Sequence, residues 1–117
     1  MNLIFDGSYA GFLTSVFECF DRKVFDAKIF DKEGYVPSFF DEDIDVITDT
    51  EKANRVLKGL KSKLKPEFVK QLYWVFLSED QKARNALLYI IQSVFKNQTN
   101  ILDNFGDDRV LYFHQMF

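Results

Sequence analysis

Few residues in this sequence have the types and spacing that enzyme chemistry needs. There is no glycine-rich phosphate loop, no zinc-binding spacing and no nucleophile elbow. His114 is the only histidine and Cys19 the only cysteine, so a Ser/His/Asp or Cys/His arrangement would have to use them. Cys19 lies within an apolar helical pattern, which favours a buried, unreactive thiol. We predict no catalytic residue, and a non-catalytic protein is favoured over an enzyme.

Asp6-Gly7-Ser8 stands between an apolar segment and a helical pattern. The free N–H groups at a helix start can bind an anion, but the carboxylate of Asp6 would repel a phosphate. The favoured interpretation is a tight turn at Gly7 with Ser8 as the helix N-cap. Thr48 and Asp49, which precede the next helical pattern, receive the same structural interpretation.

An acidic cluster lies toward the end of the first half of the chain. Its carboxylates are hard oxygen ligands, but their spacing is not that of a calcium loop. We therefore predict a solvated acidic face, with neither a metal nor a cofactor. The cluster consists of Asp41, Glu42, Asp43, Asp45 and Asp49.

A run of basic residues is the feature that points most directly to a partner. No acid interrupts it between residues 52 and 65. Such a run can neutralise phosphates, or it can be an ordinary solvated helix face, and both interpretations stay open. Residues 1–51 hold 12 acids and 4 bases, a balance of −8, whereas residues 52–117 hold 6 acids and 11 bases, a balance of +5. The run consists of Lys52, Arg55, Lys58, Lys61, Lys63 and Lys65.

The elements that position these residues can be predicted from hydrophobic spacing. Residues 2–5, 27–30 and 44–47 have the composition of short strands. Apolar residues at helical spacing predict helices over 9–23, 53–64, from Pro66 to about 76, and 83–95. A polar turn is expected at 97–100, and short helices at 101–105 and 108–117. The strands preceding helices should pair with each other, because an isolated strand is barely stable.

These elements predict an α+β fold that is predominantly helical. We expect a small two- or three-stranded sheet packed on about four to six helices. The 117 residues suit a single domain, and 47% hydrophobic residues indicate a globular one. Phe supplies 14 of the aromatic residues and has no polar tip, so most of its rings should be buried here or against a partner. The single cysteine and the lack of a signal peptide or membrane span predict a cytoplasmic protein.

Short motifs spread along the chain resemble a bacterial family of unknown function. Residues 5–18 (FDGSYAGFLTSVFE) are similar to its N-terminus, where an aromatic residue and Asp-Gly-Ser/Thr precede Gly-Leu-Leu-Thr and an amphipathic helix. Arg22-Lys23 matches the end of that helix. Further matching blocks are 46–49 (VITD), 51–53 (EKA), 55–56 (RV), 77–79 (LSE) and 108–110 (DRV). The order and spacing of these blocks carry the resemblance.

The resemblance implies a role in DNA metabolism or DNA repair. Family members are encoded beside a radical SAM protein thought to modify or repair DNA, and some are fused to a uracil-DNA-glycosylase-like domain. Members usually continue beyond the position of Phe117, so residues 1–117 would be the N-terminal part of a longer family domain. The resemblance brings no catalytic residues with it.

Three functional hypotheses follow. The first is an accessory domain that docks on a DNA-processing enzyme, the radical SAM protein being the expected partner, and that touches the DNA backbone through residues 52–65. The second is part of a DNA-processing enzyme whose site needs a further C-terminal segment. The third is an interaction module unrelated to DNA.

Overall fold

The computed structural model describes residues 1–96, 101 and 106–116, and the chain in it divides into two compact units. Unit 1 is Met1–Leu57 and unit 2 is Lys58–Phe117. The boundary falls inside helix α2 (Thr50–Lys63), which contributes to both units. Each unit is described by itself below.

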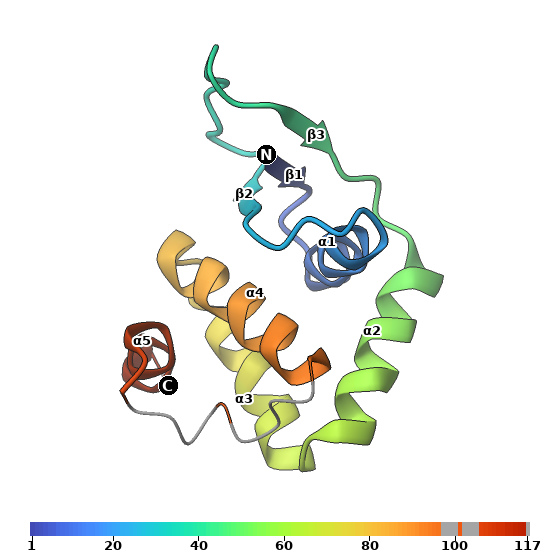
Figure 1. Cartoon of the computed structure of the whole chain (residues 1–117), viewed down its shortest axis with the longest axis vertical. Helices are drawn as coiled ribbons and strands as arrows, with labels where there is room; N and C mark the ends of the chain where they lie inside the picture. The colour runs from blue at the N-terminus through green and yellow to red at the C-terminus, as the bar shows by residue number, and fades with distance from the viewer. Residues whose placement is uncertain (97–100, 102–105, 117) are drawn as a thin grey trace. The chain divides into compact units, whose positions relative to one another are not determined.

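Unit 1 is built on a three-stranded sheet in the order β2-β1-β3 (Figure 1). The strands are β1 (Asn2–Phe5), β2 (Lys28–Asp31) and β3 (Asp43–Asp45), and both neighbours pair with β1 in parallel. All four residues of central β1 are buried, as expected for a parallel strand covered on both faces. The predicted pairing of the strands before the first two helices is confirmed, although β3 begins one residue early and ends at Asp45.

Helix α1 (Tyr9–Asp21) connects β1 to β2 and packs on β1. Phe12 and Val16 are completely buried, and the Phe5 and Phe12 rings meet edge to face at 6.3 Å between centroids. The helix ends slightly earlier than the predicted residue 23, because Lys23 takes a left-handed conformation with φ 55°. The spacing of apolar residues predicted this buried face correctly.

Unit 2 is helical in the residues described. It contains the end of α2, α3 (Pro66–Phe76), α4 (Gln81–Phe95) and α5 (Asp108–Met116), with α4 packed on both α3 and α5. Pro66 occupies the first turn of α3, as predicted, and the Asp80 carboxylate caps α4 by accepting a hydrogen bond from Ala83 N at 3.0 Å. The side chains that bury completely in this unit include Leu60, Leu72, Val75, Leu87, Ile90, Ile91, Val94, Val110 and Phe113.

Gly59 is a poor helix former inside α2, and its packing explains its presence there. A Cβ at this position would lie 2.6 Å from Cε1 of Phe95, so the ring occupies the space that a side chain would need. The backbone of α2 is thereby in close contact with the end of α4. The packing offsets the intrinsic cost of glycine in a helix, which is about 1 kcal/mol relative to alanine.

The predicted fold class is confirmed as α+β with helices dominant among the described residues. No described helix has the length and apolar character needed to cross a membrane. The predicted turn at 97–100 and most of the predicted helix at 101–105 lie outside the described residues.

Candidate functional site

The carboxyl end of β1 carries the turn that sequence analysis singled out. The Asp6 carboxylate accepts hydrogen bonds from Ser8 N at 2.9 Å, from Ser8 Oγ at 2.5 Å and from Thr48 Oγ1 at 2.8 Å. Ser8 Oγ in turn accepts from Gly11 N at 2.9 Å, which confirms Ser8 as the N-cap of α1. The structure therefore joins Asp6 and Ser8 to Thr48, which lies forty-two residues from Asp6 in the sequence.

Two glycines make this close arrangement possible. Gly7 has φ +87°, a conformation that disfavours other residues, and a Cβ there would lie 2.7 Å from Asp31 Oδ2. A Cβ at Gly11 would overlap the Asp6 carboxylate and lie 3.0 Å from Thr48 Oγ1. Sequence analysis did not identify Gly11 or Asp31 as part of this cluster.

Thr14 links α1 to the start of α2. Its hydroxyl donates to the carbonyl oxygen of Ala10 at 2.7 Å, accepts from Asp49 N at 3.1 Å, and lies 3.2 Å from the carbonyl oxygen of Asp49. Asp49 Oδ1 accepts from Lys52 N at 3.1 Å, as a helix-capping carboxylate does. Sequence analysis missed Thr14, which is fully buried in the structure.

The hydrogen bonds of this cluster connect the turn after β1 to α1 and to the segment before α2. The hydrogen bond from the Ser8 hydroxyl is the main reason that the pKa of Asp6 is lowered, with further hydrogen bonds from Ser8 N and Thr48 acting in the same direction. An ionised Asp6 is no proton donor near neutral pH, and its charge opposes an anion at the start of α1. These contacts support the structural interpretation of Asp6, Gly7, Ser8, Thr48 and Asp49.

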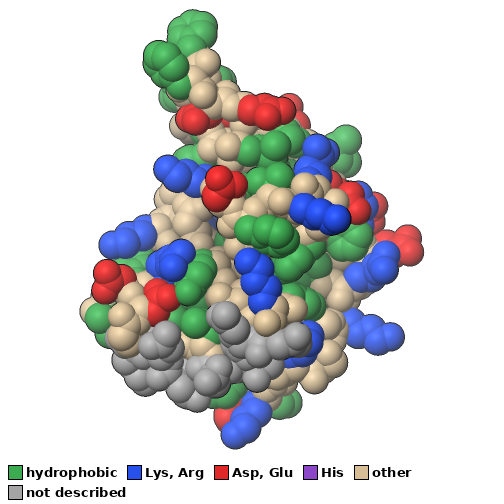
Figure 2. Space-filling model, in the orientation of Figure 1, with side chains coloured by type: hydrophobic (Ala, Val, Ile, Leu, Met, Phe, Trp, Pro, Cys, Tyr) green, Lys and Arg blue, Asp and Glu red, His purple; other side chains and the backbone are tan. Residues whose placement is uncertain are grey.

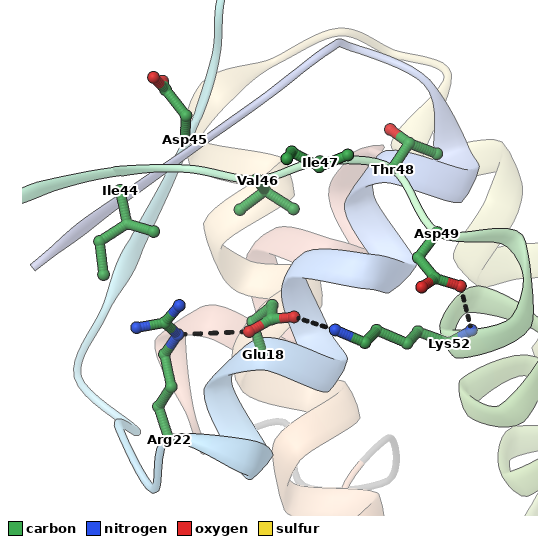
Figure 3. A pocket seen from close by; sticks show the side chains of 9 residues that line it. All are labelled: Glu18, Arg22, Ile44, Asp45, Val46, Ile47, Thr48, Asp49 and Lys52. Atoms are coloured by element: carbon green, nitrogen blue, oxygen red, sulfur yellow. Dashed lines mark hydrogen bonds and ion pairs between the residues drawn. The ribbon is translucent and has the colours of Figure 1, made fainter.

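A pocket of about 270 Å³ opens beside this cluster (Figure 3). Glu18 lies at its centre and accepts from Lys52 Nζ at 2.7 Å and from Arg22 Nε at 3.2 Å. The hydrogen bond from Lys52 is the largest cause of the lowered pKa of Glu18, and Arg22 adds to it. Ile44 and Val46 point toward these charged groups in Figure 3. Both cations therefore hold Glu18 in its ionised form, so it is not an activated acid.

The structure divides the predicted basic run into residues that have partners or are half-buried and residues that are exposed to solvent. Lys52 is committed to Glu18, and the Arg55 guanidinium lies 5.5 Å from the centre of the Phe17 ring. Lys63 is half-buried. Three exposed lysines remain. Lys58 and Lys61 are three residues apart and share one side of α2, and Lys65 is the extended residue directly before α3.

The single cysteine and histidine do not form a catalytic arrangement. Burial is the main reason that the pKa of Cys19 is raised to about 11, so the thiol stays protonated at neutral pH. His114 packs edge to face on Phe113, with 5.3 Å between ring centroids. Within the described residues, no group of three His, Cys, Asp or Glu side chains could hold a metal ion.

An exposed apolar loop between β2 and β3 escaped sequence analysis. Val36, Phe39 and Phe40 are 80%, 104% and 96% exposed. Hydrophobic side chains stand out from the surface in Figure 2 where Figure 1 draws this loop. A possible signal was the pair of phenylalanines directly before Asp41-Glu42-Asp43, outside any helical or strand spacing. We call residues 35–43, which end at the first residue of β3, the Phe39 loop.

Comparisons with family models, curated proteins and solved structures found no match for this chain.

Proposed function

We propose that this protein is a non-catalytic accessory domain in DNA metabolism or repair. It docks on a radical SAM protein or another DNA-processing enzyme in the cytoplasm and contacts the DNA backbone weakly. The observation that carries the proposal is the Phe39 loop, which presents two fully exposed phenylalanine rings. A partner that covers rings this exposed binds more favourably, because burying the rings removes apolar surface from water.

The loop stands on a hydrogen-bonded base. The hydroxyl of Tyr35 donates to Asp43 Oδ1 at 2.7 Å, and Asn2 Nδ2 donates to both residues at 3.1 Å. These bonds tie the two ends of the loop to the first residue of β1. Pro37 further restricts the backbone between them. A loop with fixed ends loses less conformational entropy on binding than a free segment does.

The charges beside the rings specify the kind of partner surface. Asp41, Glu42 and Asp43 follow Phe40 directly and are exposed. Their negative field would repel the phosphates of a nucleic acid, so Phe39 and Phe40 are suited to a protein. The complementary surface is an apolar socket with Lys or Arg at its rim.

DNA contact is assigned to the other unit. Lys58 and Lys61 on α2 and Lys65 directly before α3 are exposed and can each neutralise a phosphate. Contacts of this kind carry no sequence information, and three of them give only weak binding. The accessory domain would therefore depend on its protein partner for specificity.

The proposal is tested by capture from the native cell, using the tagged full chain and mass spectrometry. We expect wild-type protein to capture a radical SAM or other DNA-processing enzyme, and the double variant Phe39→Ser, Phe40→Ser to lose it. Ile47→Ser is the matched control, since Ile47 is 86% exposed but lies outside the Phe39 loop. Tyr35→Phe should weaken capture while leaving both rings in place.

Circular dichroism first establishes that each variant is folded. Capture of the same enzyme by wild type and by the loop double variant would contradict docking through the Phe39 loop. Capture that depends on the loop but brings down only proteins unconnected with DNA would favour an interaction module outside DNA metabolism.

A further inference from the structure

Helix α3 exposes a row of aromatic and basic side chains on one face. Tyr73, Trp74 and Leu77 are 42%, 67% and 53% exposed, and Lys70 is exposed as well. Positions 70, 73, 74 and 77 follow the i, i+3, i+4, i+7 spacing that puts side chains on one side of a helix. We call these four residues the α3 row.

The exposure of this row does not come from a poorly packed helix. Val69, Leu72, Val75 and Phe76 on the opposite side of α3 are all buried. Helix α3 therefore has a complete core face and, in addition, an aromatic face turned to solvent. An amphipathic helix usually carries charged or polar residues on its solvent side, so Trp74 and Leu77 need another explanation.

Cations extend from the α3 row across a shallow apolar pocket. The pocket measures about 270 Å³ and is lined by Leu64, Pro66 and Val69, with Lys61 and Lys70 also contributing. Lys70 thus belongs both to the pocket and to the α3 row. Glu67 is exposed one turn before Lys70 and reduces the local positive charge.

We infer that the α3 row is a binding platform for single-stranded DNA. The indole of Trp74 stacks on a base, Tyr73 offers a second ring beside it, and Lys70 and Lys61 hold the phosphates on either side of the apolar pocket. This assignment rests on the proposed function for its choice of DNA, and it goes further by naming the form of DNA that is bound.

Two physical arguments favour an unpaired strand over other occupants. Bases in a duplex are stacked on each other, so their faces are not available to Trp74, whereas an unpaired base offers its face to any aromatic ring. A protein partner is disfavoured because lysine is depleted from the cores of protein interfaces, and Lys70 lies one helical turn from Trp74 in the same row. Rings next to lysines are the combination that single-strand binding proteins use.

Trp74 provides a direct measurement because it is the only tryptophan in the chain. Oligothymidylate of about 10 nucleotides is added to the full chain at low salt, a length within the range that one such module covers. We expect saturable quenching of the tryptophan emission as a base stacks on the indole. A duplex of the same length should leave the emission nearly unchanged.

Variants separate stacking from charge, with binding followed by the anisotropy of labelled oligothymidylate. Trp74→Ala should weaken binding by about five- to a hundredfold, the range expected for one stacked base. Trp74→Phe should restore most of the affinity, since it keeps a ring. Lys70→Gln should make the slope of log K against log salt shallower by about 0.7. Leu111→Ala serves as the control, because Leu111 is 41% exposed on α5 and outside the α3 row.

The outcomes distinguish this inference from the proposed function. Absence of quenching at low salt, equal quenching by duplex, or unchanged binding by Trp74→Ala would each overturn the platform on α3. None of these three outcomes would contradict capture of a DNA-processing enzyme through the Phe39 loop. Conversely, quenching that follows the Trp74 variants would uphold the platform even if capture through the Phe39 loop failed.

Discussion

At the scale of single residues, side chains that look suited to chemistry are engaged in holding the backbone. The Asp6 carboxylate accepts hydrogen bonds from both Ser8 and Thr48. Gly11 has no side chain because the Asp6 carboxylate lies where its Cβ would be. The turn after β1 thereby binds β1, α1 and the segment before α2 together.

The Ser8 hydroxyl is expected to matter for stability. Replacing Ser8 by Ala removes the cap of α1 and the main hydrogen bond to Asp6, so the free energy of unfolding should fall by about 0.5–2 kcal/mol. Urea denaturation followed by circular dichroism measures the loss. Ser8→Thr is the matched control, since it keeps a capping hydroxyl. Full stability of the alanine variant together with loss of a binding event would instead assign Ser8 a functional role.

Asp6 should make the free energy of unfolding depend on pH in the acid range. Its pKa is lowered in the fold, so it stabilises the protein fully above the unfolded aspartate value of about 3.9, and this contribution is lost as the pH falls through the folded pKa. We expect urea denaturation to show the free energy of unfolding declining below about pH 5, and declining less in Asp6→Asn. Asp26→Asn, at an exposed position, is the control. Parallel pH profiles of wild type and Asp6→Asn would contradict this account.

At the scale of elements, apolar spacing predicted the buried faces of the helices with one exception: it placed Tyr73 on the inward face of α3, and Tyr73 is 42% exposed. The stripe of α4 is buried as expected, with Leu87, Ile90, Ile91 and Val94 at 0% exposure. On α1, Phe12 and Val16 are buried and Phe20 is half-buried. Apolar spacing was a weaker guide to the burial of strand residues, because a strand of three or four residues contains too few positions to establish a period.

The core of unit 2 can be tested at Ile90. Ile90→Ala should lower the free energy of unfolding by about 2–5 kcal/mol, because it leaves a cavity in a fully packed site. Leu111→Ala removes a comparable side chain that is 41% exposed, and its cost should be clearly smaller. A loss at Ile90 below about 0.5 kcal/mol, the size of an ordinary surface effect, would show that the face of α4 was misassigned.

At the scale of the whole molecule, the two ends of the sequence differ in charge. The balance of −8 in residues 1–51 and +5 in residues 52–117 places the acids largely in unit 1 and the bases largely in unit 2. Protein docking is therefore assigned to the acidic unit and DNA contact to the basic one. Since Lys52 and Arg55 have partners within unit 1, the proposed phosphate contacts reduce to Lys58, Lys61 and Lys65.

Duplex binding should follow from these three lysines. We expect sequence-independent affinity no tighter than ~10⁻⁵ M at physiological salt, with a slope of log K against log salt of about −3. Lys58→Glu with Lys61→Glu should weaken binding equally for all sequences, as measured by fluorescence anisotropy. Lys28→Glu with Lys32→Glu changes the net charge equally on exposed positions of unit 1 and is the matched control. Binding that responds equally to both pairs would mean that net charge, and not the surface of α2, controls the affinity.

The sequence by itself determined the fold class, the helical faces and the caps. These properties depend on residues close together in the chain: Ser8 and Gly11 are three positions apart, and so are Asp80 and Ala83. The spacing of residues close together in the chain is therefore enough to predict these properties. The paucity of catalytic residue types was also a property of the sequence alone.

Only the tertiary structure decided which polar residues are engaged and which apolar residues are exposed. Lys52 appeared to belong to a basic surface until the fold brought it 2.7 Å from Glu18, thirty-four residues away. The rings of Phe39 and Trp74 could have been core residues by composition, yet both are exposed. The physical reason is that contact and burial depend on residues distant in sequence, whose approach is set by the packing of whole elements.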